Sequence, residues 1–139
     1  MSTWAIGHTN RFKAAIAQRP VIDWQSLYGI SDIGFWFCRT ELKADLFKDP
    51  NGKEIYWKKS PLAYASKVQT PIRLLHGEWD MRCPISQSEE YFTAIKQTGT
   101  KADFIRYPQS FHGVSRNGLP NIRIQRIQDV YNWFDKYKN

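Results

Sequence analysis

Three short apolar runs, each with a proline or glycine within two residues of its end, are the feature that most constrains the fold of this chain. They cover residues 14–18, 72–76 and 104–107, a length that suits buried β-strands better than helices. Between the second and third runs, Pro84 can open a helix, Gly99 can end it, and an apolar stripe follows helical spacing. Such a strand–helix–strand unit requires parallel strands. The sequence therefore predicts an α/β domain with a short parallel sheet.

The remaining segments differ in how well they fit around such a sheet. After the third run, five apolar residues recur at helical spacing and predict one face of a terminal helix: Ile124, Ile127, Val130, Tyr131 and Phe134. Residues 23–60 follow neither period, so we treat them as an inserted, partly helical excursion. Its three adjacent aromatics, Phe35-Trp36-Phe37, cannot share one face, so at least one is expected to be exposed or buried in a partner; the alternative is irregular core packing.

Composition excludes several classes of protein. With 42% hydrophobic and 24% charged residues, the 139 residues suffice for one folded domain and are not typical of a disordered chain. No apolar run approaches the length of a membrane span. The chain opens without a secretory signal, so we expect a cytoplasmic protein with no membrane contact. In that compartment Cys38 and Cys83 are expected to be reduced, although a disulfide between them is the alternative.

The net charge of +7 raises the hypothesis of nucleic-acid binding. However, basic residues are spread from Arg11 to Lys138, and the densest group is only the pair Lys58-Lys59. A dispersed charge of this kind favours a solvated basic surface over a phosphate-binding patch. We therefore expect no nucleic-acid partner.

Candidate catalytic residues follow two of the predicted strands. In open parallel sheets, functional sites lie beyond the carboxyl ends of the strands. Asp80 follows the second run and His112 follows the third, which is the order of acid and base in α/β-hydrolase triads. An imidazole can take a proton from a hydroxyl while a carboxylate holds its other nitrogen. Spacing alone leaves open that Asp80 caps the next helix and His112 is a turn residue. His76, which ends the second run, is expected to be structural.

Three stretches, in order, resemble the prolyl oligopeptidase family of serine peptidases, especially its acylaminoacyl peptidase and dipeptidyl peptidase branch. They are MSTWAIGHTNRFKAAIAQRPVIDWQSLYG, HGEWDMRCPISQSEEYF and YPQSFHGVSRNGLPNIRIQRIQDVYNWFDKY. The resemblance runs from Met1 to about Tyr137. It implies the C-terminal part of an α/β-hydrolase catalytic domain, in one unit spanning residues 1–139. The implied architecture is three-layer α/β/α, with a short parallel sheet that is incomplete at one edge.

The resemblance makes Asp80 the triad acid and His112 the general base of a peptidase that hydrolyses short or N-acylated peptides without a cofactor or metal. Met1 matches the end of the family's Gly-x-Ser-x-Gly-Gly-Tyr-Met elbow, so the nucleophilic serine would precede this chain. The loop that completes the oxyanion hole would precede it as well. Ser2 is displaced from the serine position by more than a helical turn and is not expected to substitute. The chain is therefore expected to be inactive alone.

The resemblance also implies residues that contact the peptide substrate of the full-length enzyme. An apolar specificity pocket is implied at Val21, Trp24 and Leu27, although an aromatic cluster can equally be core or lid packing. Arg82 matches a position that contacts a substrate carbonyl in relatives. The alternative for Arg82 is a surface ion pair with an acidic residue of its own loop: Glu78 or Asp80.

Three hypotheses of different class remain. The chain is a fragment of a serine peptidase that needs its N-terminal complement, a non-catalytic self-associating domain derived from a hydrolase, or a basic nucleic-acid binder. The strand at residues 14–18 would have an exposed edge that can pair with another copy, which predicts a homo-oligomer. Light scattering and binding at low salt distinguish the last two hypotheses.

Overall fold

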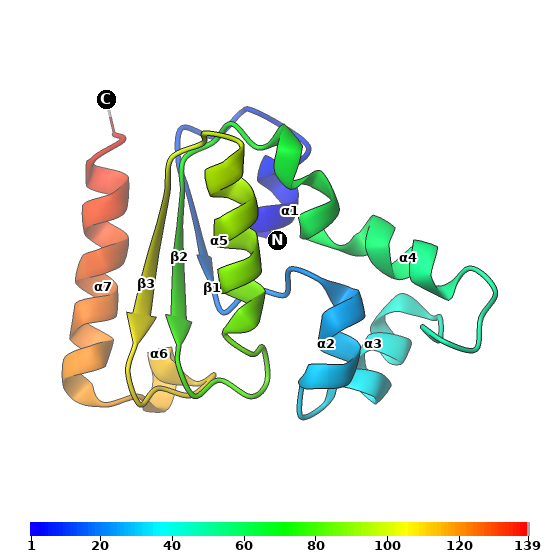
Figure 1. Ribbon diagram of the computed structural model, residues 1–139. Helices are drawn as coiled ribbons and strands as arrows, with labels where there is room; N and C mark the ends of the chain where they lie inside the picture. Colours follow the sequence, from blue (N-terminus) through cyan, green and yellow to red (C-terminus); the bar gives the residue numbers. More distant parts are fainter. Residues whose placement is uncertain (139) are drawn as a thin grey trace.

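The computed structural model describes residues 1–138 as a parallel sheet with helices on both faces (Figure 1). The elements, in chain order, are α1 (Ser2–Ile6), β1 (Ala15–Gln18), α2 (Trp24–Ile30), α3 (Gly34–Leu42), α4 (Gly52–Lys59), the 3-10 helix η1 (Pro61–Lys67), β2 (Ile72–Gly77), α5 (Ser86–Gln97), β3 (Ala102–Tyr107), α6 (Val114–Asn117) and α7 (Pro120–Asp135).

The three predicted strands are confirmed, and they lie in the order β1-β2-β3 with both pairs parallel. In the register, Ala15 lies opposite Ile72, and Ile72 lies opposite Ala102. β3 begins two residues earlier than predicted because Ala102 and Asp103, which precede the apolar run, still pair with β2. β1 pairs with β2 alone among the described residues, so one edge of the sheet is incomplete. All three strands end at the same side of the molecule.

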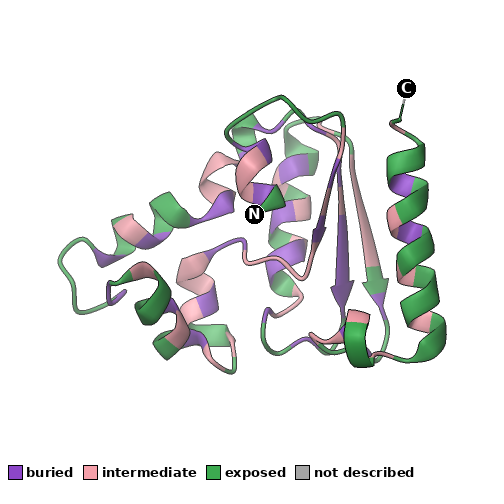
Figure 2. Cartoon of the chain, turned by 180° about the vertical axis from the view of Figure 1, so that it is seen from behind, coloured by how far each residue is buried: buried purple, intermediate pink, exposed green. Residues whose placement is uncertain are grey.

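The alternation of strand side chains produces two separate cores. One face of the sheet packs against α1, η1 and α5, and its core contains Ile6, Ala15, Ala17, Ile72, Leu74, Tyr91 and Ile95. The opposite face packs against α6 and α7 around Leu75, Tyr107 and Val114. Figure 2 shows the buried colour concentrated along β2, the central strand. These layers confirm the predicted α/β/α arrangement.

The connection between β2 and β3 follows the sequence signals with small shifts. α5 begins at Ser86, two residues after Pro84, and ends at Gln97. Gly99 has a φ of +80°, a left-handed conformation that glycine adopts without steric cost, and it turns the chain towards β3. Tyr91 and Ile95 on α5 are fully buried against the sheet, as the apolar stripe predicts.

The terminal helix exists, but the apolar face predicted for it does not pack on the sheet. Four of its five residues are exposed: Ile124, Ile127, Tyr131 and Phe134. Each of the two isoleucines has 60% of its surface accessible. The buried side of α7 carries Trp133 and Asp129 instead, with Ile122 and Val130 half-buried. Polar contacts explain the choice: the Tyr107 hydroxyl donates to Asp129 Oδ2 at 2.8 Å, and Arg73 donates to the Asp129 carbonyl at 2.9 Å.

The excursion is helical, as predicted, and forms a core of its own. α2, α3 and α4 enclose Leu27, Cys38, Ala44, Leu46 and Tyr56. Phe35 and Trp36 are 57% and 51% exposed, which confirms that the aromatic triplet cannot be buried together. Phe37 stacks on Trp24 with ring centroids 5.9 Å apart.

A single buried glutamine attaches the start of the excursion to α5. Gln87 Oε1 accepts hydrogen bonds from the backbone N–H groups of Ile22 at 2.8 Å and Asp23 at 2.9 Å. The Asp23 carboxylate in turn caps α2 through the N–H groups of Gln25 and Ser26. The position of the excursion beside the sheet is therefore fixed at its first residues.

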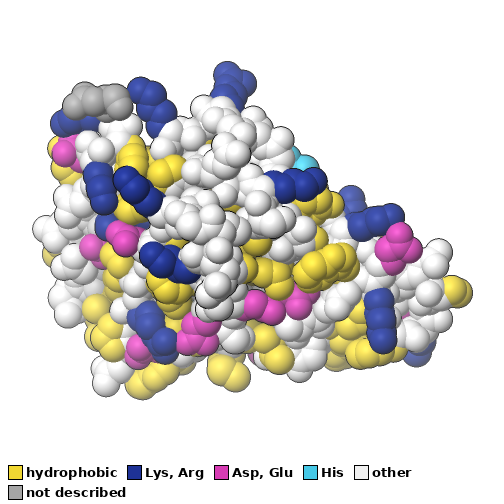
Figure 3. All heavy atoms as spheres, turned by 45° about the horizontal axis from the view of Figure 1, so that its top comes forward, with side chains coloured by type: hydrophobic (Ala, Val, Ile, Leu, Met, Phe, Trp, Pro, Cys, Tyr) yellow, Lys and Arg dark blue, Asp and Glu magenta, His cyan; other side chains and the backbone are white. Residues whose placement is uncertain are grey.

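Cys38 and Cys83 are both buried and free, so the alternative of a disulfide between them is wrong. None of the helices within residues 1–138 is long and apolar enough to cross a bilayer. On the face shown in Figure 3, Lys and Arg side chains are scattered between acidic and apolar ones instead of forming one patch.

Candidate active site

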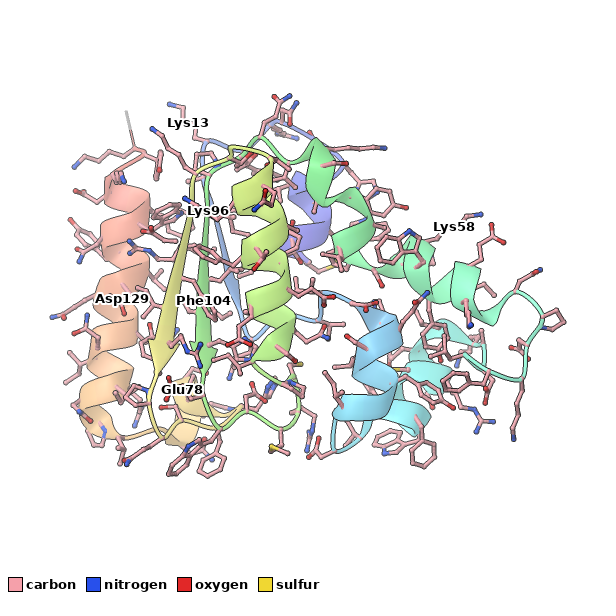
Figure 4. The ribbon with its side chains drawn as sticks, in the orientation of Figure 1. Lys13, Lys58, Glu78, Lys96, Phe104 and Asp129 are labelled. Atoms are coloured by element: carbon pink, nitrogen blue, oxygen red, sulfur yellow. The ribbon has the colours of Figure 1, made fainter. Side chains whose placement is uncertain are left out.

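Two loops at the carboxyl end of the sheet form the candidate active site. One follows β2 and carries Asp80, and the other follows β3 and carries His112. Figure 4 shows Glu78, at the start of the first loop, at the end of the sheet towards which the strand arrows point; Lys13 lies at the opposite end. The parallel register brings both loops to this end because β2 and β3 finish in step.

Backbone hydrogen bonds hold the two loops together. The Glu78 N–H donates to the Tyr107 carbonyl at 2.9 Å, and the Trp79 N–H donates to the Ser110 carbonyl at 3.0 Å. Gly77 makes this approach possible, because a Cβ there would lie 2.7 Å from the Ser110 carbonyl carbon. The distance between Asp80 and His112 is therefore set by backbone hydrogen bonds between their two loops.

Asp80 is almost completely buried, with 2% of its surface accessible. Its Oδ1 accepts hydrogen bonds from the backbone N–H groups of Arg82 and Cys83, each at 2.9 Å. Its Oδ2 lies 2.8 Å from His112 Nδ1. The carboxylate thus closes its own loop with one oxygen and contacts the imidazole with the other.

The same contacts set the ionisation of Asp80. Burial opposes ionisation and by itself would raise the pKa of Asp80, but hydrogen bonds from His76, the Cys83 N–H and His112 outweigh it. The pKa of Asp80 is consequently below its ordinary value. At neutral pH this residue is an anion that can orient and stabilise a neighbouring cation.

His112 is oriented for proton transfer. Because Nδ1 donates to a carboxylate, the neutral ring carries its proton on Nδ1 and leaves Nε2 as an acceptor. The side chain is 34% exposed, so the ring is open on one side. Arg19, the residue after β1, donates to the His112 backbone carbonyl and fixes the loop from the third strand. Sequence reasoning missed Arg19, since only the tertiary fold brings the end of β1 to this loop.

A cavity of about 610 Å³ adjoins the end of β1. Its walls come from α1, the residues after β1 and the start of the excursion, and include Ser2, Arg19, Val21 and Trp24. Val21 and Trp24 therefore lie where a pocket exists. Leu27 does not: it is 1% exposed and packs in the excursion core, which corrects its assignment to the pocket in favour of core packing.

Arg82 forms an ion pair, but with a residue that the sequence analysis did not consider. Its Nε and one terminal nitrogen donate to the two carboxylate oxygens of Asp32 at 2.8 and 3.1 Å. The alternative partners Glu78 and Asp80 were wrong, because Glu78 pairs with Arg106 at 3.2 Å and the Asp80 oxygens are occupied inside the loop. This geometry orients the guanidinium from the excursion side.

Among residues 1–138, no three His, Cys, Asp or Glu side chains gather in a way that could hold a metal ion. The burial of the thiols raises the pKa of Cys38 to about 11 and that of Cys83 to about 12, so neither is a nucleophile at neutral pH. Asp80 and His112 form an acid–base pair at this end of the sheet. Such a pair can accept a proton from a hydroxyl and hold the resulting imidazolium.

Comparison with known proteins identifies relatives of this arrangement. The sequence model of the prolyl oligopeptidase family matches residues 1–139. The uncharacterized peptidase YuxL of Bacillus subtilis is 45% identical over 137 residues, which cover 99% of this chain and 20% of that protein. The acylamino-acid-releasing enzyme of Arabidopsis thaliana is 32% identical over 143 residues, covering 99% of this chain and 18% of that enzyme.

The fold has a solved counterpart as well. The acylaminoacyl peptidase of Pyrococcus horikoshii superposes on this chain with a TM-score of 0.88 at 32% sequence identity. The superposition covers 97% of this chain and 22% of the peptidase. The chain thus has the α/β-hydrolase architecture and spans about a fifth of the length of the relatives it matches. With a match along its whole length, this chain belongs to the prolyl oligopeptidase family.

Proposed function

We propose that this chain supplies the acid and the base of a serine-peptidase active site that hydrolyses short or N-acylated peptides. Asp80 is the acid and His112 the base. The observation that carries the proposal is the 2.8 Å contact between Asp80 Oδ2 and His112 Nδ1 in a member of a peptidase family. In this proposal, the chain forms the C-terminal part of the catalytic domain as one unit, residues 1–139.

The chemistry follows from the proton positions. His112 Nε2 accepts the proton of a serine hydroxyl as that oxygen attacks the peptide carbonyl, and Asp80 stabilises the imidazolium that forms. The imidazolium then donates the proton to the leaving amine. In the second half of the reaction, Nε2 takes a proton from the water that hydrolyses the acyl-enzyme and returns it to the serine.

Substrate contacts are proposed at the cavity and at Arg82. Val21 and Trp24 offer an apolar wall to a substrate side chain. Asp32 uses two of the Arg82 nitrogens, which leaves donors on the third for a substrate carbonyl. The names of two relatives, acylamino-acid-releasing enzyme and acylaminoacyl peptidase, support an N-acylated substrate.

We also propose that the chain is inactive without a serine from outside residues 1–139. Within the described residues, His112 has hydrogen-bond contacts with Asp80 and Arg19, and none with a hydroxyl group. Ser2 lines the cavity at the start of α1. Turnover by the chain alone that His112→Ala abolishes would contradict this part of the proposal.

A chimera tests the function itself. The matched 137 residues of the Bacillus subtilis relative are replaced by this chain, with the unmodified relative as the positive control. We expect the chimera to release a chromogenic amine from N-acylated amino-acid substrates and His112→Ala to abolish the release. A folded chimera that is inactive on substrates its parent cleaves would overturn the proposal.

A second candidate function, self-association without catalysis, is favoured by two surfaces. β1 is unpaired on one side among the described residues, and α7 exposes the apolar stripe Ile124, Ile127, Tyr131 and Phe134. Light scattering across a concentration series tests it. A rising mass supports a homo-oligomer, whereas a monomer at all concentrations contradicts it.

A further inference from the structure

A second imidazole faces Asp80. His76 is the penultimate residue of β2, four residues before Asp80, and is fully buried. Its Nε2 lies 2.6 Å from the Cys83 carbonyl oxygen and 3.4 Å from Asp80 Oδ2. Its Nδ1 lies 2.7 Å from Ser88 Oγ on α5. The ring therefore joins the loop that carries the acid to the helix that covers the sheet.

The neighbours of His76 determine where its proton lies. Both groups near Nε2, the Cys83 carbonyl and the Asp80 carboxylate, are acceptors that cannot donate. Nε2 must therefore carry a proton, since an unprotonated nitrogen would face two oxygens. Nδ1 is then free to accept, and the Ser88 hydroxyl is the donor within reach. One arrangement of protons satisfies the whole neutral group.

The proton on His76 Nε2 faces two oxygens, and contact with each of them helps to fix the Asp80 carboxylate. The nearer one, the Cys83 carbonyl, belongs to the residue whose N–H holds Asp80 Oδ1. The more distant one is Asp80 Oδ2 itself, which also accepts the hydrogen bond from His112 Nδ1. His76 thereby fixes the loop and faces one side of Oδ2, which leaves the other side to His112.

We propose that His76 is a positioning residue of the Asp80–His112 pair, with its tautomer set by the two acceptors at Nε2 and the Ser88 hydroxyl donating to Nδ1. It does not touch substrate or reacting atoms; it acts by fixing the direction of the carboxylate. The inference rests on the proposed function, because it concerns the same acid and base. A merely structural His76 would affect the stability of the fold without affecting the hydrogen bond to His112.

The wild-type chain gives the first test. A long-range proton–nitrogen NMR spectrum distinguishes the two tautomers of a buried histidine. We expect His76 to carry its proton on Nε2. A proton on Nδ1 instead would overturn the proposal, whatever the behaviour of any variant.

Variants of His76 give the second test, with the solvent exchange rate of the low-field His112 Nδ1 proton as the readout. His76→Asn keeps a polar group near Nδ1 but cannot reach Asp80, so exchange should accelerate by roughly tenfold or more, as expected for a lost hydrogen bond to a charged group. His76→Gln places a donor near Nε2 and should restore slow exchange. Wild-type exchange in folded His76→Asn, or equal acceleration in both variants, would overturn the proposal.

Ser88→Ala keeps the experiment informative if the His76 variants do not fold, because alanine is well tolerated in a helix. Ser60→Ala is the matched control, since Ser60 is an equally buried serine in the excursion. Exchange should accelerate in Ser88→Ala and stay unchanged in Ser60→Ala; equal rates would remove Ser88 from the proposal. Asp80→Asn should abolish the protected proton, and its persistence there would refute the Asp80–His112 pair itself.

Discussion

Gly77→Ala is the substitution that should separate the two loops of the candidate site. A Cβ at this position would lie 2.7 Å from the Ser110 carbonyl carbon and 3.1 Å from the Ser110 Cβ. The carbonyl belongs to the backbone and cannot rotate away, so the loops must move apart. The hydrogen bond from the Trp79 N–H to the Ser110 carbonyl would be strained at the same time.

The expected cost can be converted into a melting temperature. Overpacking of this kind destabilises by about 2 kcal/mol. At about 2.1 cal/mol/K per residue, the 139 residues unfold with an entropy of about 0.29 kcal/mol/K. The melting temperature of Gly77→Ala should therefore fall by about 7 °C, and the protection of the His112 Nδ1 proton should be lost with it.

Gly29→Ala is the matched control, measured by the same thermal unfolding followed by circular dichroism. Gly29 lies in α2, and a Cβ there would meet nothing within 4 Å. Because alanine favours a helix by up to about 1 kcal/mol over glycine, this variant should melt at the wild-type temperature or slightly above it. A Gly77→Ala variant that melts within about 2 °C of wild type would refute the argument that Gly77 is needed for loop contact.

Further predictions concern ionisation and buried polar groups. Because its folded-state pKa is below the unfolded value, Asp80 contributes stability above about pH 4 that is lost as the pH falls through the folded pKa. The difference in unfolding free energy between Asp80→Asn and wild type, measured by urea unfolding, should therefore shrink below that pH. A constant difference would contradict this. The raised thiol pKa values, about 11 for Cys38 and about 12 for Cys83, predict slow alkylation at pH 8 in the native chain and fast alkylation in urea; fast native labelling would contradict the burial. Gln87→Ala removes the acceptor for two buried N–H groups and should lower the free energy of unfolding by about 2–4 kcal/mol. Gln97→Ala, at an exposed position of the same helix, should leave stability unchanged. Similar urea midpoints for the two variants would contradict the anchoring role of Gln87.

The sequence predicts the sheet because strand signals are local. Residues 72–76 form a short apolar run between a proline and a glycine, and a run of this length with these boundaries is typical of a buried strand. The positions of Asp80 and His112 follow from the same logic, since parallel strands bring successive loops to one edge. The order of these two residues predicted their shared edge of the sheet, although spacing alone left open a capping role for Asp80 and a turn role for His112.

Other parts of the site depend on contacts between distant segments. The partner of Arg82 is Asp32, 50 residues away, and no local spacing relates them. The buried side of α7 is chosen by the contacts of Asp129 with Tyr107 and Arg73, so the periodicity of its apolar residues predicted the wrong face. The role of Leu27 was missed for a similar reason, because the excursion folds around a core of its own.

The central claim, that Asp80 and His112 act as the acid and base of a serine peptidase, is tested most directly by Asp80→Asn in the chimera with the Bacillus subtilis relative. The substitution preserves shape but removes the charge that orients and stabilises the imidazole of His112. We predict that kcat falls by about 10⁴ while KM changes little, as for the loss of the acid in other triads. A kcat within about tenfold of the unsubstituted chimera would contradict the account.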